Sequence, residues 1–454
     1  MNTSIFKAYD IRGLWPDQIN KSDVLKISKA FAIFVKDFYS IESPSIIVGY
    51  DIRKSSEEIF DAVVNGLNSE NCKVISIGCC STPLNYFANW KREADGSVMI
   101  TASHNPKEYN GLKFSLRQVV ALAEENGVEK IKKIALGMPE NDYVFEGKVK
   151  KQEEETMIDE YLDFLVKEAE GIDIQQFKIA VDCSNGMVGP EFKRLAGKLG
   201  IRYQGIFMEP DGDFPNHEPN PLNEKAIASL QELMLGDRFD FGIIFDGDGD
   251  RFMVLTEKGE MIRSDFLAGV LAKFFISKIN NKKIVCDARF GRGMREYLEH
   301  SGIDIIKSKV GYSNIKKNMR EASAFFGAEL SAHFFWKDFC YAESPLLTLI
   351  RLMKILSVEN KKINDMIKPM QNYFSSGELN FEVLDKEGKL KKIKQVYIGE
   401  NQSHLDGLTV ECADWWFNAR LSNTESLLRL IVEAKSQKLL DEKVSELEKI
   451  IKEK

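Results

Sequence analysis

The stretch that decides the fold class is Phe241-Gly-Ile-Ile-Phe-Asp-Gly-Asp-Gly-Asp-Arg251. Its first five residues form a short apolar run that is typical of a buried β-strand. Asp246, Asp248 and Asp250 follow at once, separated by glycines that let the backbone turn tightly. A buried strand that runs into a polar, glycine-rich loop is typical of α/β proteins, in which ligands bind at the carboxyl ends of the strands.

Similar apolar, β-branched runs recur along the first two thirds of the chain. They lie at residues 45–50, 72–77, 96–101, 178–182 and 283–287. Between them, apolar residues repeat at helical spacing, for example at 24–38 and 57–67. This alternation predicts α/β units with largely parallel or mixed sheets.

The chain of 454 residues is too long for a single hydrophobic core, and its composition indicates where it divides. Residues 140–155 are charged and polar, Gly259 closes a hairpin-like segment, and Pro369 interrupts a helical pattern. We therefore expect four domains. Their predicted bounds are 1–150, 151–257, 258–368 and 369–454.

The composition excludes several classes of protein. Hydrophobic residues make up 44% and charged residues 29% of the chain, which is typical of a globular protein and not of a disordered one. Because the net charge is −7, we expect neither nucleic acid nor a membrane surface as a partner. The start of the chain does not look like a signal peptide, and seven scattered cysteines without a C-x-x-C pair argue against disulfides and zinc. A cytoplasmic protein with buried thiols is expected.

Three aspartates in such a short loop repel one another unless a cation lies among them. Carboxylate oxygens are the ligands that Mg²⁺ and Ca²⁺ prefer. Asp246, Asp248, Asp250 and Glu257 also match the spacing of an EF-hand calcium loop, but Arg251 stands where that loop requires glycine. A magnesium site is therefore favoured, with an EF-hand and a solvated acidic turn as the alternatives.

The segment Thr101-Ala-Ser-His-Asn-Pro106 also follows a predicted strand. Ser103 lacks the G-x-S-x-G elbow of a hydrolase nucleophile. Its hydroxyl can accept a phosphoryl group where cations and hydrogen-bond donors neutralise the charge. The alternative is an ordinary turn rich in serine and asparagine.

Two further loops carry polar groups that suit a sugar phosphate. The segment Arg420-Leu-Ser-Asn-Thr-Glu-Ser-Leu-Leu-Arg429 offers cations, hydroxyls and an amide at an expected helix start, with an ordinary N-cap as the alternative. Glu329, Ser331 and His333 occupy every second position, so in an extended loop they point the same way, as recognition of sugar hydroxyls requires. His333 could instead be a hydrogen-bonded interior histidine.

In this order, the loops resemble the α-D-phosphohexomutase superfamily, and most closely its phosphomannomutase/phosphoglucomutase branch. The likeness extends over essentially the whole chain. It also includes Phe6-Lys-Ala-Tyr-Asp-Ile-Arg-Gly13, His104-Asn-Pro-Lys-Glu-Tyr-Asn-Gly-Leu-Lys113, Phe214-Pro-Asn-His-Glu-Pro-Asn-Pro221 and Leu405-Asp-Gly-Leu408. The Ser-Asn-Thr form of the last loop, at 422–424, argues against the phosphoglucosamine mutase branch.

The resemblance implies a four-domain architecture, with three related mixed α/β domains and a smaller α+β C-terminal domain around a central cleft. It implies reversible interconversion of hexose 6- and 1-phosphates, of mannose and also glucose, through a phosphorylated Ser103 and a hexose 1,6-bisphosphate that also activates the enzyme. One Mg²⁺ per chain would be held by Asp246, Asp248, Asp250 and an oxygen on Ser103. The partners would be small sugar phosphates, with the chain a monomer or a dimer.

The resemblance also assigns roles to individual residues. Ser103, His104, Lys113 and Arg251 would act in catalysis. Lys113 would serve either as a proton donor and acceptor or as an electrostatic clamp, and both interpretations stay open. The residues expected to bind the substrate are Tyr9, Arg12, Arg289, Tyr312, Glu329, Ser331, His333, Arg420, Ser422, Asn423, Thr424 and Arg429.

The chain departs from the family pattern at several positions. Ala328 and Ala332 replace glycines of the sugar loop, and a methyl group at position 332 makes a positive φ costly. Tyr312 stands in place of a histidine and Arg289 in place of a lysine, so neither retains the proton chemistry of the usual residue. Ser426 replaces a proline. Because Ser103 and the aspartate loop are intact, we expect these departures to affect the choice of substrate and the rate rather than the type of reaction.

Three other functions compete with the phosphomannomutase hypothesis. One is a phosphoglucomutase, which only the relative kcat/KM for the two sugars would distinguish. Another is a non-catalytic sugar-phosphate binding protein derived from the family, motivated by Tyr312 and the altered sugar loop. The third is a calcium sensor built on the aspartate loop.

Overall fold

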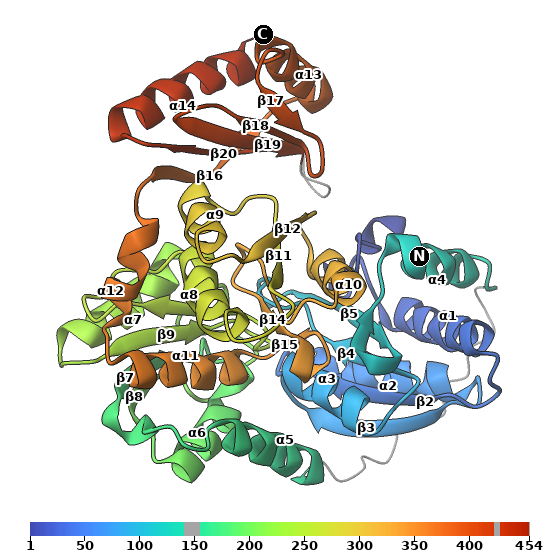
Figure 1. Ribbon diagram of the computed structural model, residues 1–454. Coiled ribbons are helices and arrows are strands. Elements are labelled where there is room, and N and C mark those ends of the chain that lie inside the picture. Colours follow the sequence, from blue (N-terminus) through green and yellow to red (C-terminus); the bar gives the residue numbers. More distant parts are fainter. Residues whose placement is uncertain (140–154, 422–426, 454) are drawn as a thin grey trace. The chain divides into compact units, whose positions relative to one another are not determined.

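The computed structural model describes residues 1–139, 155–421 and 427–453, and divides into two compact units. Unit 1 consists of Met1–Ile262 and Ser331–Ile363, and unit 2 of Arg263–Leu330 and Asn364–Lys454. Each unit contains strands with helices packed against them (Figure 1). The domain boundary expected near residue 150 lies outside the described residues, and those near 257 and 368 stay predictions.

The first sheet of unit 1 has the strand order β1-β5-β4-β2-β3, with β6 paired to β5. Strand β2 runs parallel to β3 and β4, whereas β5 runs antiparallel to β4 and β1. The strands are β1 (Ile11–Leu14), β2 (Ser45–Tyr50), β3 (Lys73–Cys79), β4 (Gly96–Ile100), β5 (Tyr109–Leu116) and β6 (Val120–Ala121). The helices that follow or separate them are α1 (Lys21–Tyr39), α2 (Ser56–Asn68), α3 (Thr82–Lys91), α4 (Val128–Leu136) and α5 (Glu155–Glu168).

The second sheet of unit 1 has the order β10-β9-β7-β8, parallel except for β10. Its strands are β7 (Lys178–Asp182), β8 (Arg202–Ile206), β9 (Phe241–Phe245) and β10 (Phe252–Leu255), and its helices are α6 (Val188–Leu199) and α7 (Glu224–Leu235). The remaining elements of this unit are β14 (Phe334–Trp336), β15 (Ala342–Glu343) and α11 (Pro345–Glu359). All five residues of β9 are buried, as the apolar run predicts.

Unit 2 begins with parallel strands in the order β12-β11-β13. They are β11 (Lys283–Asp287), β12 (Asp304–Ser308) and β13 (Phe326–Ala328), accompanied by α8 (Ser264–Ile276), α9 (Arg292–Glu299) and α10 (Tyr312–Ala322). Helix α12 (Ile363–Ile367) starts at the boundary of the two units. Short 3₁₀ turns occur in both units, at Thr3–Ile5, Arg117–Val119, Glu124–Asn126, Ile174–Gln176, Lys337–Phe339 and Lys368–Met370.

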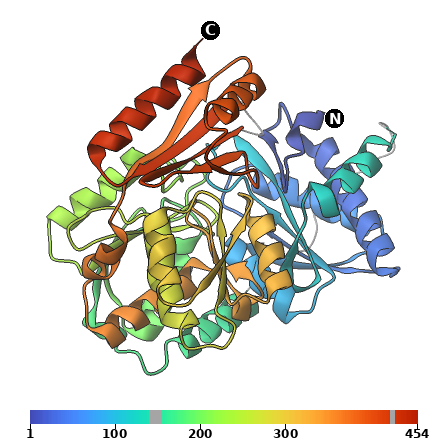
Figure 2. The ribbon, with the colours of Figure 1, turned by 45° about the horizontal axis from the view of Figure 1, so that its top comes forward.

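The C-terminal part of unit 2 is an antiparallel sheet in the order β16-β20-β19-β18-β17, covered on one face by two helices (Figures 1 and 2). The strands are β16 (Phe374–Glu382), β17 (Asn401–Ser403), β18 (Leu408–Glu411), β19 (Trp415–Leu421) and β20 (Leu427–Ala434). The helices are α13 (Lys386–Val396) and α14 (Gln437–Lys452). The charged C-terminal helix predicted from the sequence is α14.

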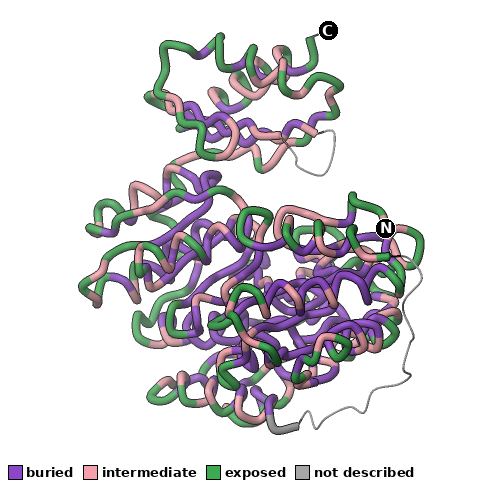
Figure 3. Tube along the Cα trace, turned by 90° about the vertical axis from the view of Figure 1, so that its right-hand side faces the viewer, coloured by how far each residue is buried: buried purple, intermediate pink, exposed green. Residues whose placement is uncertain are grey.

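Burial follows the sheets closely. Buried residues lie mainly along the strands and on the helix faces that cover them, while exposed residues lie on outer helix faces and turns (Figure 3). No helix among the described residues is both long and apolar enough to cross a membrane. The described ranges include all seven cysteines, and none of these forms a disulfide bond.

Glu411 connects the C-terminal sheet to the preceding α/β part of unit 2. Its carboxylate lies 2.7 Å from both Arg292 and Arg295 and 3.5 Å from Lys307. Burial alone would raise the pKa of Glu411, but these cations lower it from 4.5 to about 2. The ion pairs therefore stabilise the folded protein only while Glu411 is ionised.

We expect Glu411→Gln to lower the free energy of unfolding by about 2 kcal/mol at pH 7, because hydrogen bonds to charged groups are lost. Since the folded pKa lies below the unfolded one, this stabilisation is complete above pH 4.5 and disappears as the pH falls towards about 2. Urea unfolding of both proteins from pH 7 to pH 2.5 measures the difference, with Asp414→Asn, which breaks an exposed pair to Lys435, as the control. A difference that is constant over this pH range would contradict the assignment.

Candidate active site

The aspartate loop joins β9 to the antiparallel strand β10, and its three carboxylates converge. Asp246, Asp248 and Asp250 are buried, and each offers an oxygen within 4.8 Å of the others. The second oxygen of Asp246, Oδ1, accepts backbone N–H groups of Gly249, Asp250 and Arg251 at 3.0, 3.0 and 3.1 Å. The loop therefore folds around the side chain of its first aspartate.

The glycines of this loop are required for two different reasons. A Cβ atom at Gly247 would lie 3.0 Å from the carbonyl oxygen of Ser103, so a side chain there would push the Ser103 loop away. Gly249 has φ +78°, a left-handed conformation that favours glycine. The sequence Asp-Gly-Asp-Gly-Asp thus allows both the tight turn and the close approach of the serine.

Two alternatives for the aspartate loop are wrong. An EF-hand needs a helix on each side of the loop, but strands β9 and β10 flank it. A solvated acidic turn would expose its carboxylates, whereas Asp246 and Asp248 are fully buried and Asp250 is 2% exposed. The loop is instead a buried concentration of negative charge, which needs compensating cations.

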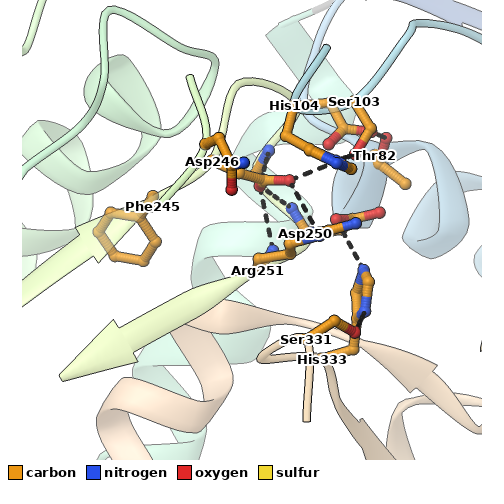
Figure 4. Close-up of polar contacts among 12 residues, drawn as sticks. Thr82, Ser103, His104, Phe245, Asp246, Asp250, Arg251, Ser331 and His333 are labelled. Carbon is orange, nitrogen blue, oxygen red and sulfur yellow. Dashed lines mark hydrogen bonds and ion pairs between the residues drawn. The ribbon is translucent and has the colours of Figure 1, made fainter. Parts of the chain in front are cut away.

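Ser103 lies against this loop (Figure 4). Its Oγ atom is 3.4 Å from Asp246 Oδ2 and 3.2 Å from His104 Nδ1. The residue has φ +54°, a left-handed backbone conformation that is strained for serine. The sequence prediction that a hydroxyl from the first third of the chain meets the aspartates from the second is confirmed within unit 1.

Lys113, on β5, lies between two of the carboxylates. Its Nζ atom donates to Asp248 Oδ2 at 2.7 Å and to Asp250 Oδ2 at 2.6 Å. Burial alone would lower the pKa of Lys113, but the two carboxylates raise it above its ordinary value. The ammonium group is therefore held in its charged form, which favours the electrostatic clamp over proton transfer.

The three carboxylates differ in their electrostatic environments. Burial, Asp250 and Asp248 together raise the pKa of Asp246 well above its usual range. Burial would also raise the pKa of Asp250, but Lys113 and His333 lower it well below that range. Asp246, the carboxylate beside Ser103, is thus the member of the cluster that most needs a further cation.

The donor set fits a hard divalent cation. Among the described residues, Asp248 Oδ1 is a buried oxygen without a hydrogen-bond partner. A buried carboxylate oxygen without a partner is costly, and a metal ion would compensate for it. Three carboxylates that offer one oxygen each within 4.8 Å of one another match the oxygen ligands of Mg²⁺.

Two arginines and a histidine surround Ser103 and the aspartates. Arg251 Nε is 3.7 Å from Asp246 Oδ2, and Arg12 on β1 donates to the Asn105 side chain at 2.6 Å. Burial and the nearby Arg251 and Arg12 lower the pKa of His104 well below its usual value, so its imidazole is neutral at pH 7. Tyr9 precedes β1 and is half-buried.

His333 contacts the aspartate loop. Its Nε2 atom lies 3.1 Å from Asp250 Oδ1, and its Nδ1 lies 3.0 Å from Ser331 Oγ, so it is the hydrogen-bonded interior histidine considered from the sequence (Figure 4). Ala332 between them has φ +71°, the conformation expected to be costly for alanine. Its carbonyl accepts the N–H of Phe252 at 3.1 Å, which fixes this loop beside β10.

Two residues of the site were missed from the sequence. Arg53 donates all five of its N–H groups: one to Asp51 and four to the carbonyls of Ser103, Asn105, Pro106 and Tyr109, at 2.7 to 3.1 Å. Thr82 Oγ1 donates to Asp248 Oδ2 at 2.7 Å. The repeated Asp-x-Arg pattern at 10–12, 51–53 and 287–289 is a signal that could have revealed Arg53.

The other predicted residues that the structure describes lie in unit 2. Arg289 follows β11 and binds Asp287 through both Nε and Nη2, at 3.1 and 2.8 Å. Glu329 is 2% exposed and accepts the N–H of Gly311 at 2.6 Å, at the start of α10, where Tyr312 is the first residue. Glu329 therefore orients the N-terminus of this helix.

The expected helix start at the last loop is wrong. Arg420 lies on β19 and Arg429 directly opposite on β20, so the two cations occupy neighbouring antiparallel strands. Alternating apolar residues on both sides favour strands, and serine, asparagine and threonine occur in turns as well as at helix N-caps. Ser422, Asn423 and Thr424 lie outside the described residues.

Family comparisons agree along the chain. Models of phosphoglucomutase/phosphomannomutase match it in four consecutive parts: alpha/beta/alpha domains I, II and III at residues 3–140, 159–259 and 263–373, and the C-terminal domain at 378–450. These matches confirm the four-domain α/β architecture expected from the sequence.

Individual proteins support the same family. A phosphomannomutase of Methanocaldococcus jannaschii is 36% identical and one of Vibrio cholerae 34%, covering 98% of this chain and 97% and 98% of theirs. A crystal structure of a phosphoglucomutase/phosphomannomutase family protein from Burkholderia thailandensis is similar with a TM-score of 0.88 and 28% identity, covering 100% of this chain and 98% of that one. The chain therefore belongs to the phosphoglucomutase/phosphomannomutase family of hexose phosphate mutases.

Proposed function

We propose that this enzyme interconverts mannose 6-phosphate and mannose 1-phosphate, accepts the glucose phosphates as well, and carries the transferred phosphoryl group on Ser103. The observation that supports this most is Ser103 Oγ at 3.4 Å from Asp246, at the edge of a buried aspartate cluster. The carboxylates would repel a phosphate on this hydroxyl unless cations neutralise the charges of the phosphate and of the aspartates. Lys113 and Arg251 supply two such charges.

Asp246, Asp248 and Asp250, together with an oxygen of phosphorylated Ser103, would hold one Mg²⁺, which neutralises charge on the phosphoryl group. The chain's own residues position the reaction. Arg12 binds the Asn105 side chain within the Ser103 loop, and His104 Nδ1 lies 3.2 Å from the serine oxygen. His104 is thus placed to hold a proton at that oxygen.

The transfer has two balanced steps. In the first, the bond between Ser103 Oγ and phosphorus breaks while a hexose hydroxyl forms the new O–P bond, which gives a hexose 1,6-bisphosphate. In the second, the other phosphate of the reoriented bisphosphate returns to Ser103. We assign the non-reacting phosphate to Arg289, Arg420, Arg429 and residues 422–424, and the sugar to Tyr9, Tyr312, Glu329, Ser331 and His333.

Assays with mannose and glucose phosphates, Mg²⁺ and a catalytic amount of hexose 1,6-bisphosphate test this proposal. Both sugars should be converted, with kcat/KM for mannose at least equal to that for glucose. Failure to convert either sugar, with the protein folded and magnesium present, would contradict it. A large preference for glucose would instead favour the phosphoglucomutase interpretation.

Removing divalent cations with EDTA should lower the rate by ~10³-fold, because a cation at a transferring phosphoryl group contributes several kcal/mol. Added Mg²⁺ should restore it. Titration calorimetry should show Mg²⁺ binding that is weakened in Asp248→Asn and unchanged in Asp211→Asn, which alters an exposed loop aspartate outside the cluster. Full activity in EDTA would rule out the metal role.

A non-catalytic sugar-phosphate binding protein is not favoured, because the chain matches named phosphomannomutases over almost its full length. Intact mass spectrometry separates the two functions. A phosphate mapped to Ser103 after incubation with hexose 1,6-bisphosphate supports the enzyme. Ligand binding without any phosphate on Ser103 would support the binding protein.

A further inference from the structure

Three arginines of unit 2 converge on a single carboxylate, that of Glu378. Arg289 Nη1 and Arg420 Nη2 donate to Glu378 Oε2 at 3.2 and 2.9 Å, and Arg429 Nη1 donates to Oε1 at 3.1 Å. Burial would raise the pKa of Glu378, but these arginines lower it below its usual range. Glu378 is therefore an anion at neutral pH, bound by all three cations.

The fold brings these groups together from distant parts of the sequence. Arg420 and Arg429 face each other across β19 and β20, and Glu378 lies on the neighbouring strand β16, at a break in its register with β20. Arg289 approaches from the end of β11, fixed by Asp287. The side chain of Glu378 is 25% exposed, so it can leave the arginines for solvent without breaking the core.

Positive charge is concentrated in this cluster. Three guanidinium groups contact the single carboxylate of Glu378, and Arg289 also binds Asp287. A phosphate dianion offers more oxygen acceptors to the same N–H groups and more charge than a carboxylate does. A phosphate would therefore compete with Glu378 for the donors that Glu378 now occupies.

We infer that the carboxylate of Glu378 competes with phosphate for the three arginines. The non-reacting phosphate of the substrate displaces this carboxylate, so Glu378 sets the affinity of the site for phosphate. When the phosphate leaves, Glu378 binds the arginines again and offsets the loss of their partner. To reorient, the bisphosphate has to leave this site with one of its phosphate groups and bind again through the other. A site that binds phosphate too tightly would therefore slow the reorientation. The identity of the ligand rests on the proposed function, but the competition itself does not.

Glu378→Gln tests the inference, because it keeps the shape of the side chain and removes the charge. By titration calorimetry, the Kd for inorganic phosphate and for hexose 1,6-bisphosphate should fall by about tenfold, since a competing anion is removed. In steady-state assays KM and kcat should both fall, because release of phosphate slows. Glu387→Gln, on the exposed first turn of α13, is the matched control and should change none of these values.

A second variant, Glu378→Asp, tests the inference independently in case Glu378→Gln does not fold. Glu378→Asp keeps the charge but shortens its reach by one methylene group, so it should bind phosphate with an affinity between those of the wild type and Glu378→Gln. Weaker or unchanged phosphate binding in a folded Glu378→Gln protein would overturn the inference, since Glu378 would then only preorganise the arginines. Inactivity of the wild type on hexose phosphates, with phosphate binding still tighter in the variant, would overturn the proposed substrate and leave the competition intact.

Discussion

Ser103→Ala should lower the mutase rate by at least ~10⁴-fold, because the variant has no atom that can carry the phosphoryl group. The loss should appear in kcat, with the affinity for hexose phosphates nearly unchanged, since the substitution leaves intact the arginines to which we assign the non-reacting phosphate. Intact mass spectrometry should find phosphate on the wild type and none on the variant after incubation with hexose 1,6-bisphosphate. A coupled assay in both directions measures the rate.

The control for this variant is another hydroxyl in the same part of unit 1. Ser69 Oγ caps the end of α2 by donating to the Gly66 carbonyl at 2.8 Å and contacts no member of the aspartate cluster. Ser69→Ala should keep the rate within about twofold while losing a few tenths to about 1 kcal/mol of stability. Unchanged activity in Ser103→Ala would refute the phosphoserine mechanism.

The parts of the fold that sequence analysis predicted correctly are those with a strong local signal. The run at 241–245 forms a fully buried strand, and the helical spacing at 24–38 lies within α1. Ser103 and Asp246 come together because both follow strands whose carboxyl ends carry the polar loops of their sheets. Strands that end in polar residues were enough to predict that Ser103 and the three aspartates lie together.

Where one residue type serves two local structures, the sequence was ambiguous. The segment after Arg420 was expected to start a helix, but β19 and β20 run on each side of it. Serine, threonine and asparagine cap helices and also form turns, and only the pairing of the flanking strands decides between them.

Contacts between distant residues could not be predicted where the two residues do not both belong to recognisable loop motifs at strand ends. The sequence analysis did not foresee that His333 contacts Asp250, 83 residues away in sequence. The convergence of Arg420 and Arg429 on Glu378 depends on the register of β16, β19 and β20, which no local pattern encodes, and Arg289 joins them from the end of β11. Such contacts are set by tertiary packing.

Arg53 is a further residue that sequence analysis missed, and among the substitutions its replacement should have the second largest effect on the rate. Arg53→Lys should lower kcat by about 10²-fold, because lysine has three N–H donors where arginine uses five, and a reacting group displaced by about 1 Å loses that much rate. Two of the four carbonyls that it binds belong to Ser103 and Asn105, so fewer donors would leave the strained backbone at Ser103 less firmly held. The charge opposite Asp51 is kept, which protects the fold.

The kinetic pattern distinguishes positioning from general damage. In Arg53→Lys, kcat should fall while KM and the calorimetric affinity for Mg²⁺ stay close to the wild-type values, since lysine keeps the positive charge near Asp248 and the hydrogen bonds of Arg53 go to Asp51 and to backbone carbonyls. Arg92→Lys is the matched control, because Arg92 also makes a two-point contact, with Glu160, but on an exposed surface. Equal losses in both variants, or a fall in Mg²⁺ affinity that parallels the fall in kcat, would show that Arg53 supports the fold as a whole. A selective loss of kcat would mean that one buried guanidinium, bound to four carbonyls of a single loop, holds the serine at the distance that phosphoryl transfer requires.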